Sequence, residues 1–203
     1  MGVAEKVRRL TEAEYLVLER AAEFKSEFHE GEMFAMAGGT RRHSLITGNL
    51  LREFSGKLDG RNCALYNSDL RVKVEATGLL TYPDLSMACG DQRFLDSEED
   101  VLVNPLLIAE VLSDSTEAYD RGTKFSHYRQ IPSLREYLLV SHREPRIDQF
   151  IRQPEEDWLL RTTAGLRATL RLSSCKISIP LARIFARVQF VPTPIRPPAP
   201  PRS

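Results

Sequence analysis

The sequence predicts one α/β domain, α+β in the broad sense, with a mixed central sheet flanked by helices. Residues 106–112 form a nearly unbroken apolar run, which is typical of a strand covered on both faces of a sheet. Other segments carry apolar residues at helical spacing, and several short ones alternate between apolar and polar residues as strands do. A chain of 203 residues is long enough for one domain with a substantial core.

Two helices are expected in the first third of the chain. Residues 11–28 predict a helix capped by Thr11, with Glu14 three residues later as its capping-box partner. A glycine-containing turn then leads into a short strand over 33–37. Residues 42–58 repeat apolar side chains at helical spacing and predict the second helix.

The rest of the domain is expected to consist mainly of strands. In chain order, strands are predicted over 64–66, 69–74, 79–87, 106–112, 136–140, 146–152 and 158–162, with further short strands within 168–179. Residues 91–100 are polar, acidic and typical of a loop. A helix over 119–130, stopped by Pro132, follows the apolar strand, and a closing helical turn is expected at 181–185.

The domain is expected to span residues 10–190, with a short tail over 1–9. A second tail is expected over 191–203, where six of the 12 prolines fall between Pro192 and Pro201. Such a composition predicts an extended, disordered segment. It could be inert or a docking peptide for a groove that binds proline-rich segments.

Composition excludes several classes of protein. Twenty-eight basic residues balance 28 acidic ones, so the net charge gives no sign of strong, sequence-independent binding to nucleic acid. No apolar run approaches the ~20 residues that a transmembrane helix needs, so no membrane association is expected. Cys63, Cys89 and Cys175 are few, far apart and odd in number. We therefore expect buried free thiols, with neither disulfides nor a zinc site, and a cytoplasmic location.

Glu110 is the most informative residue of the chain. It stands inside an otherwise apolar strand, where a carboxylate suffers a large desolvation penalty unless a cation or hydrogen-bond donors meet it. This placement predicts a functional carboxylate. The alternative is a glutamate at a strand end that is solvated or paired in a salt bridge.

Asp84 could supply a second carboxylate to the same site. It follows Pro83 within the predicted strand over 79–87, and proline suits a strand edge or a bend. Two carboxylates from neighbouring strands can coordinate a hard divalent cation, Mg²⁺ or Mn²⁺, with water and substrate phosphate as further ligands. The main-chain carbonyl of Val111 or Leu112 is another candidate ligand. Alone, a Pro-Asp pair is also a common turn.

Lys124 lies on the predicted helix that begins a few residues after the Glu110 strand. It could orient a nucleophilic water or stabilise charge that develops on the phosphoryl group. The competing interpretation is a solvated lysine paired with Asp120 four residues earlier. Tyr128, one turn after Lys124, could face the same cleft, although packing is the favoured interpretation.

Asp84, Glu110 and Lys124, in this order along the chain, resemble the motif of a known family of nucleases. Pro83-Asp84 followed by Glu110-Val111-Leu112 resembles the PD-(D/E)XK motif of restriction-endonuclease-like folds, although position 112 is normally lysine. The stretch 110–116, followed by 120–122 and Lys124, is similar to the Uma-two (Uma2) family of endonucleases. In that family the lysine lies on the following helix, where this chain has Lys124. The resemblance covers roughly residues 10–185.

The resemblance implies a restriction-endonuclease-like fold and a metal-dependent endonuclease that hydrolyses nucleic acid, with DNA as the expected substrate and Mg²⁺ or Mn²⁺ as cofactor. It also implies Glu27, on an early helix, as an additional acidic residue of the metal site; otherwise Glu27 is a solvated residue near Lys25. His43 could be a general base or a phosphate contact, or else a helix cap or a packed ring.

The sequence leaves three functions open. The first is the endonuclease, for which a two-fold homodimer would suit cutting of both strands of a duplex. The second is a non-catalytic module of nuclease fold that binds nucleic acid or a partner protein. The third is a hydrolase of small nucleotides, which a narrow pocket would favour. An open groove lined by arginines would favour a polymer, and the candidates are Arg41, Arg42, Arg71 and Arg121.

Overall fold

The computed structural model describes residues 9–36, 38–155 and 157–190. The proline-rich tail predicted over 191–203 lies outside these residues, as do residues 1–8 of the predicted N-terminal tail. In chain order the helices are α1 (Glu12–Ala21), α2 (Arg41–Leu58), α3 (Glu117–Tyr119), the π-helical turn η1 (Asp120–Lys124), α4 (Phe125–Tyr128) and α5 (Leu181–Ile184).

The strands of the described residues form two sheets and a hairpin. They are β1 (Ser26–His29), β2 (Glu32–Ala35), β3 (Cys63–Asn67), β4 (Arg71–Val74), β5 (Leu79–Thr81), β6 (Leu85–Cys89), β7 (Val101–Leu102), β8 (Leu107–Val111), β9 (Glu136–Val140), β10 (Arg146–Arg152), β11 (Trp158–Ala164), β12 (Thr169–Leu172) and β13 (Ile177–Pro180). One sheet has the order β2-β1-β5-β4-β7, and the other has the order β11-β10-β9-β8-β6-β3. The six-stranded sheet is mixed, because β8 and β9 run parallel while its other pairs are antiparallel.

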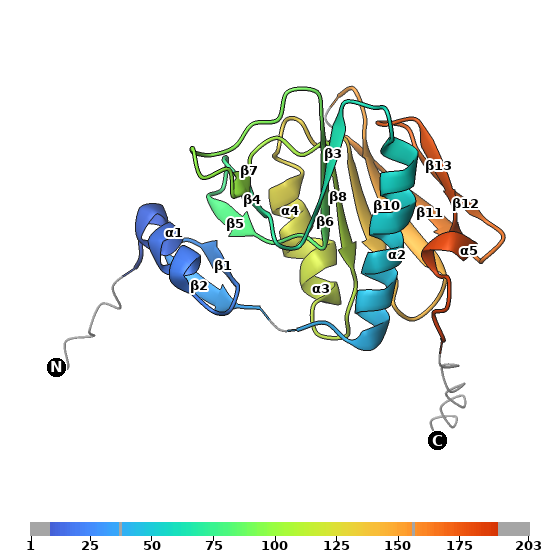
Figure 1. Ribbon diagram of the computed structural model, residues 1–203, viewed down its shortest axis with the longest axis horizontal. Coiled ribbons are helices and arrows are strands. Elements are labelled where there is room, and N and C mark those ends of the chain that lie inside the picture. The colour runs from blue at the N-terminus through green and yellow to red at the C-terminus, as the bar shows by residue number, and fades with distance from the viewer. Residues whose placement is uncertain (1–8, 37, 156, 191–203) are drawn as a thin grey trace, which may run out of the picture.

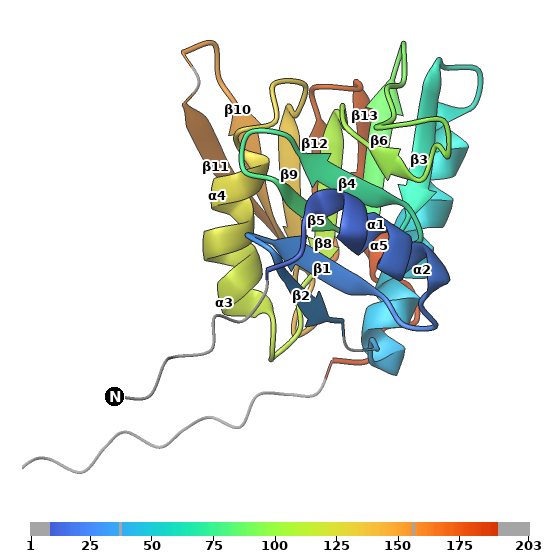
Figure 2. The same cartoon turned by 90° about the vertical axis from the view of Figure 1, so that its left-hand side faces the viewer.

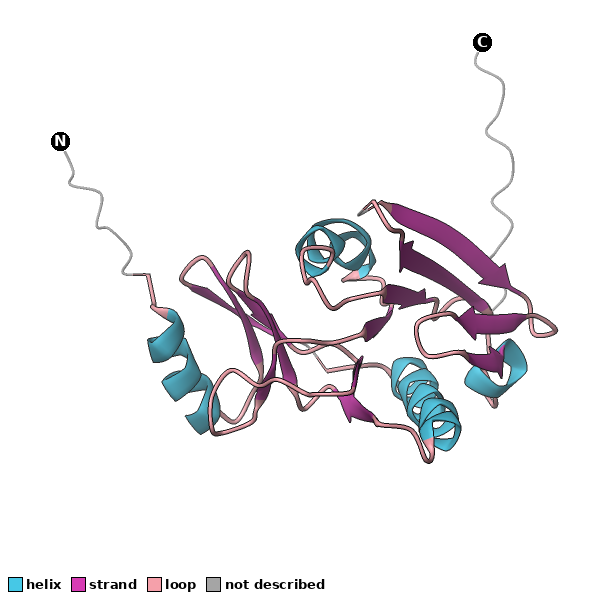
Figure 3. Cartoon of the chain, turned by 90° about the horizontal axis from the view of Figure 1, so that it is seen from above, coloured by secondary structure: helices cyan, strands magenta, loops and turns pink. Residues whose placement is uncertain are grey.

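The two sheets carry helices on their faces. Figures 1 and 3 show α1 against the outer side of the five-stranded sheet, and Figure 2 shows β1, β5 and β4 next to one another behind α1. The segment from α3 to α4 lies beside the six-stranded sheet on the side of the five-stranded sheet, and α2 lies on its other side (Figure 3). None of the helices in the described ranges is long and apolar enough to cross a membrane.

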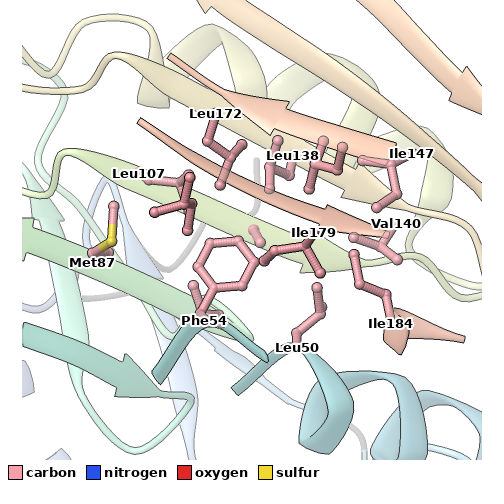
Figure 4. Close-up of a cluster of buried hydrophobic side chains, with 14 of the residues drawn as sticks. Leu50, Phe54, Met87, Leu107, Leu138, Val140, Ile147, Leu172, Ile179 and Ile184 are labelled. Atoms are coloured by element: carbon pink, nitrogen blue, oxygen red, sulfur yellow. The ribbon is translucent and has the colours of Figure 1, made fainter. Parts of the chain in front are cut away.

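The largest core cluster fills the α2 side of the six-stranded sheet. Leu50 and Phe54 of α2 pack there on Leu107 and Leu138, and the β12–β13 hairpin and α5 close the cluster (Figure 4). A second cluster lies on the opposite face, where β4 and β5 and the ring of Tyr128 meet the sheet. Because β8 is covered on both faces, its side chains are buried along the whole strand, as the apolar run predicted.

Most predicted elements are confirmed, with boundaries that move by a few residues. The helix over 42–58 is α2, and the strands over 136–140 and 146–152 are β9 and β10. The helix predicted over 11–28 is too long. It ends at Ala21, and Ser26 begins a strand of a hairpin whose two turn residues, Glu30 and Gly31, have φ of +50° and +85°. Positive φ at both turn positions matches a tight antiparallel hairpin, which competes successfully with continued helix.

The strand predicted over 79–87 is two strands in two sheets. Leu79–Thr81 belongs to the five-stranded sheet and Leu85–Cys89 to the six-stranded sheet. The chain therefore crosses between the sheets at Pro83, which has no N–H group for a ladder hydrogen bond and suits this break. The crossing places Asp84 at the junction of the two sheets.

The expectation that all three cysteines are free thiols is wrong for two of them. Cys63 on β3 and Cys89 on β6 are register partners and form a disulfide bond, whereas Cys175 is free and buried. The two bonded cysteines are 26 residues apart in sequence. Their proximity follows from the antiparallel register of β3 and β6, which cysteine spacing does not reveal.

Candidate active site

The predicted carboxylates Asp84 and Glu110 lie next to each other at the junction of the sheets. The backbone N–H of Asp84 donates a hydrogen bond to Oε2 of Glu110 at 3.3 Å, and the N–H of Val111 donates to Oδ2 of Asp84 at 2.7 Å. Both contacts follow from the antiparallel pairing of β6 with β8, whose register begins at Leu85 and Ala109. The structure thus brings together two residues that are 26 positions apart in the chain.

Strand alternation directs Glu110 into the layer between the sheets. Side chains of a strand point to opposite faces in turn. Ala109 and Val111 face the α2 core, while Ile108 and Leu112 face the second core cluster, on the side of β4 and β5. Glu110 shares that second face and is 4% exposed.

Glu110 is held by a cation and a hydroxyl group. Its Oε1 lies 3.0 Å from Nζ of Lys124 and accepts a hydrogen bond from the hydroxyl of Tyr128 at 2.9 Å. The prediction that a cation or donors meet this carboxylate is therefore matched by the contacts. Tyr128 does more than pack, because its buried hydroxyl fixes one oxygen of Glu110.

Lys124 is not a solvated lysine but lies at the centre of a buried cluster of carboxylates, namely Glu27, Glu110 and Asp120. It is 5% exposed, and its Nζ lies 3.1 Å from Oε1 of Glu27 and 3.7 Å from Oδ1 of Asp120, in addition to Glu110. The predicted pairing with Asp120 is present, but both partners are buried. The ammonium therefore neutralises carboxylates from β1, from β8 and from its own helical segment.

A π-helical turn shapes the segment that carries Lys124. The helix predicted over 119–130 is interrupted: α3 is followed by the π turn of η1, and α4 continues as α-helix to Tyr128. A π turn spans one residue more than an α turn, and such turns are frequent at functional sites. Here both ends of the turn, Asp120 and Lys124, are buried, and the hydroxyl of Tyr137 donates to the carbonyl of Asp120 at 3.0 Å. Spacing alone did not predict this irregularity.

Glu27 reaches the cluster from a strand, not from the early helix that the resemblance implied. It lies on β1, and its Oε1 accepts a hydrogen bond from Oγ1 of Thr81 besides contacting Lys124. Its Oε2 accepts from the hydroxyl of Tyr119 at 3.2 Å. The alternative of a solvated glutamate near Lys25 does not hold, because Glu27 is 9% exposed.

His43 lies against Asp84 at the first turn of α2. Its Nε2 is 3.0 Å from Oδ2 of Asp84, and the hydrogen bond with Asp84 raises the pKa of the imidazole above its usual value, although burial acts against this. A Cβ added at Gly39 would come within 2.8 Å of Nδ1 of His43, so this glycine allows the chain to pass close to the ring. Thr40, not His43, provides the helix cap.

The electrostatics of the cluster are dominated by the burial of its charged groups. Burial raises the pKa of Glu110 to about 8, with Lys124 opposing the rise and Asp120 and Asp84 adding to it. Burial also raises the pKa of Asp120. Burial disfavours the charged form of Lys124, but Glu110, Glu27 and Asp120 outweigh it and hold the pKa of the ammonium well above its usual value. A further cation would relieve the repulsion that remains.

The carboxylates of Asp84 and Glu110 suit a hard divalent cation that takes only a few of its ligands from the protein. Within the described part of the chain, no group of three or more His, Cys, Asp and Glu side chains is arranged to hold a metal ion. Mg²⁺ is usually bound through one or two carboxylates, with water and substrate phosphate completing its shell. The adjacent carboxylates of Asp84 and Glu110 meet that smaller requirement, and the excess negative charge around them favours a cation.

Asp148 anchors the π turn to the six-stranded sheet. This β10 residue is 2% exposed and accepts hydrogen bonds from Arg121 of η1 at 2.8 Å, from Arg146 at 3.0 Å and from Thr162 at 2.8 Å. Burial opposes its ionisation, yet these donors outweigh that effect and lower the pKa of the carboxyl group below its usual value. The anchor holds Arg121 three residues before Lys124.

Replacing Asp148 by Asn is therefore expected to destabilise the protein by about 1.5–3 kcal/mol at pH 7, because hydrogen bonds to a charged group are lost. A carboxyl group whose pKa is lowered by folding stabilises the protein above its unfolded pKa and loses this effect as the pH falls through the folded pKa. The difference between wild type and variant should shrink below about pH 3.8. Urea unfolding at pH 7 and about pH 3 measures it; a difference independent of pH would contradict the assignment.

The sequence did not single out every residue of the cluster. Thr81 and Tyr119 were not predicted, because neither stands out in a single chain, while Asp120 entered only as a helical partner of Lys124. Two of the arginines suggested for an open groove are used elsewhere: Arg71 is 4% exposed and paired with Asp100, and Arg121 is paired with Glu117 and Asp148. Those two therefore do not form a free basic lining.

The chain is similar to a family of restriction-endonuclease type and to two proteins of Synechocystis sp.. A family model described as "Uma2: Putative restriction endonuclease" matches residues 12–181. An uncharacterized protein of Synechocystis sp., slr1290, is 41% identical over 183 residues, which cover 90% of this chain and 94% of that protein. A second one, sll1609, is 36% identical over 177 residues, covering 87% of this chain and 100% of its own.

A solved structure shares the fold. It is described as a "putative nuclease belonging to DUF820" from Anabaena variabilis and superposes with a TM-score of 0.69 at 17% identity, covering 85% of this chain and 96% of the other. At this level of identity the likeness concerns the fold alone. The predicted fold class, a restriction-endonuclease-like mixed central sheet flanked by helices, is confirmed.

Proposed function

Because this chain belongs to the Uma2 family of restriction-endonuclease type, we propose that it is a metal-dependent endonuclease that hydrolyses phosphodiester bonds of nucleic acid, with DNA as its substrate. The observation that carries the proposal is the buried contact of Lys124 with Glu110, beside Asp84. A fold alone does not establish a function, so the argument rests on the chemistry of this cluster.

Asp84 and Glu110 would hold the metal ion, Mg²⁺ or Mn²⁺, with the main-chain carbonyl of Val111 as a further oxygen ligand. When bound, such an ion lowers the pKa of a coordinated water and offsets the negative charge of the phosphate. Tyr128 keeps Glu110 in place by its hydrogen bond, and the N–H of Val111 does the same for Asp84. These fixed contacts orient the carboxylates before substrate arrives.

The remaining polar residues have distinct roles in the proposal. Lys124 provides a fixed positive charge toward the phosphoryl group as negative charge develops there. Glu27 holds that ammonium from the β1 side and prevents it from pairing only with Glu110. His43, which contacts Asp84, would contact a phosphate or accept a proton from the attacking water.

The direct test is cleavage of plasmid DNA, single-stranded DNA and RNA with Mg²⁺ or Mn²⁺, repeated with excess chelator. We expect cutting of DNA that depends on the metal. Calorimetric titration with the metal alone should show binding in the same protein preparation. The proposal fails if no substrate is cut although the protein is folded and binds metal.

The second candidate is a non-catalytic module of nuclease fold that binds nucleic acid or a partner protein. The extensive pairing of Lys124 favours it, because this ammonium already contacts three carboxylates and could serve only to neutralise them. Absence of both cutting and metal binding, together with retained binding of nucleic acid, would select this candidate. A homodimer, which suits cleavage of both strands, is part of the endonuclease proposal and is checked by sedimentation.

A further inference from the structure

The β1–β2 hairpin has one face toward α1 and one toward the active site. On the first face, Phe28 stacks on Tyr15 of α1 at a ring separation of 4.8 Å, and its register partner Met33 packs against the same cluster. On the second face lies Glu27, whose carboxylate contacts Lys124. Because directly opposed residues of antiparallel strands project to the same face, Phe34, the register partner of Glu27, also belongs to the active-site face.

The exposure of the Phe34 ring is unusual for a phenyl ring next to a buried cluster. Phe34 is 50% exposed, although it stands directly opposite a carboxylate that is 9% exposed. It lies on β2, an edge strand of the five-stranded sheet, and within the described ranges it makes no ring contact with another aromatic side chain. The Cβ atoms of opposed residues are about 5 Å apart, so the Phe34 side chain starts from a position next to Glu27, which contacts Lys124.

We propose that Phe34 is a stacking platform for an unpaired nucleobase of the substrate. This inference rests on the proposed function and narrows its substrate class to nucleic acid with unpaired nucleotides next to the scissile phosphate. Every base has an apolar face that stacks on an aromatic ring, whereas both faces of a base inside a duplex are covered by its neighbours. A ring one strand away from Glu27 could receive the base adjoining a phosphate that contacts Lys124.

The experiment measures binding without cutting. Fluorescence anisotropy of a labelled DNA strand of about 20 nucleotides, longer than a typical binding site, is compared with that of the same sequence as a duplex. All proteins carry Glu110→Gln to suppress cleavage. The variants are Phe34→Ala, Phe34→Leu, which keeps an apolar side chain without a ring, and Phe34→Trp, which keeps a ring. Phe24→Ala is the matched control, since Phe24 is 79% exposed in the loop before β1.

We expect Phe34→Ala and Phe34→Leu to weaken binding of the single strand about tenfold, while duplex binding changes less than about twofold. Phe34→Trp should bind the single strand as well as the parent or better, and Phe24→Ala should match the parent. The inference is overturned if the parent does not bind the single strand, if the duplex loses as much affinity, or if leucine serves as well as phenylalanine. A shift of the Phe34 variants from dimer to monomer in sedimentation would also overturn it, in favour of contact with a second copy.

The two proposals fail separately. If wild-type protein cuts DNA with metal but the Phe34 variants bind single strands normally, the endonuclease stands and the stacking platform is wrong. If no substrate is cut although Phe34 controls binding of single strands, the base contact stands and the catalytic proposal fails.

Discussion

Replacement of Glu110 by Gln is expected to lower the rate of metal-dependent cleavage by about a thousandfold or more while leaving the protein folded. A metal site supplies several kcal/mol of transition-state stabilisation, and an amide does not replace a carboxylate as a ligand of a hard cation. The fold should tolerate the change, because the amide oxygen can still accept hydrogen bonds from Tyr128 and Lys124.

Because Glu110 titrates, the difference in stability between wild type and Glu110→Gln should depend on pH. Burial raises the pKa of Glu110 from its usual value of about 4.5 to about 8. Between these two pH values the folded protein therefore keeps a proton that the unfolded chain has released. The contribution of this residue to stability is therefore lost as the pH rises from about 4.5 to about 8. The glutamine variant lacks this loss, and its stability relative to wild type should increase across the same window in metal-free buffer.

The matched control is Glu136→Gln. Glu136 is fully buried on β9, the strand next to β8, but it accepts hydrogen bonds from Gln149, Ser173 and Ser174, away from the cluster around Lys124. This variant should cut at the wild-type rate. Equal cleavage by wild type and Glu110→Gln, measured on plasmid with either metal, would remove Glu110 from the reaction.

Much of the candidate site could be predicted from the sequence because its residues break the local pattern. Glu110 stands out as a charge in an apolar strand, and Asp84 follows a proline that breaks a strand. Such conflicts between a residue and its surroundings point to functional sites, since a buried charge without a use would destabilise the fold. The order of Asp84, Glu110 and Lys124 then carried the resemblance to the family that the comparison shows.

The parts that were not predictable depend on contacts between distant segments. Residue pattern could not separate α1 from β1, because Glu27 and Phe28 are buried only once the hairpin packs between α1 and the cluster around Lys124. The π turn arises in a segment whose spacing also suits an α-helix, and the disulfide between Cys63 and Cys89 depends on strand register. In each case tertiary packing overrides the local preference.

Replacement of Lys124 by Met should affect stability and activity together, in contrast with Glu110→Gln. Removing one partner of a buried ion pair costs about 3–5 kcal/mol, because the remaining charges lose their compensation. Lys124 contacts Glu110, Glu27 and Asp120, so its loss leaves three buried carboxylates without their cation. Cleavage should be lost as well if the ammonium stabilises charge on the phosphoryl group. The control is Lys73→Met, which removes a less buried lysine paired with Glu12.

A double-mutant cycle separates the two effects of Lys124. Combining Lys124→Met with Glu110→Gln removes one of the uncompensated carboxylates, so the double variant should be more stable than Lys124→Met alone, with a coupling of about 0.5–3 kcal/mol. Urea unfolding of the four proteins gives this coupling, and cleavage assays below their unfolding transitions give the activities. If Lys124→Met is folded under the assay conditions and still cuts metal-dependently, then Lys124 is a structural cation and the metal site acts without it.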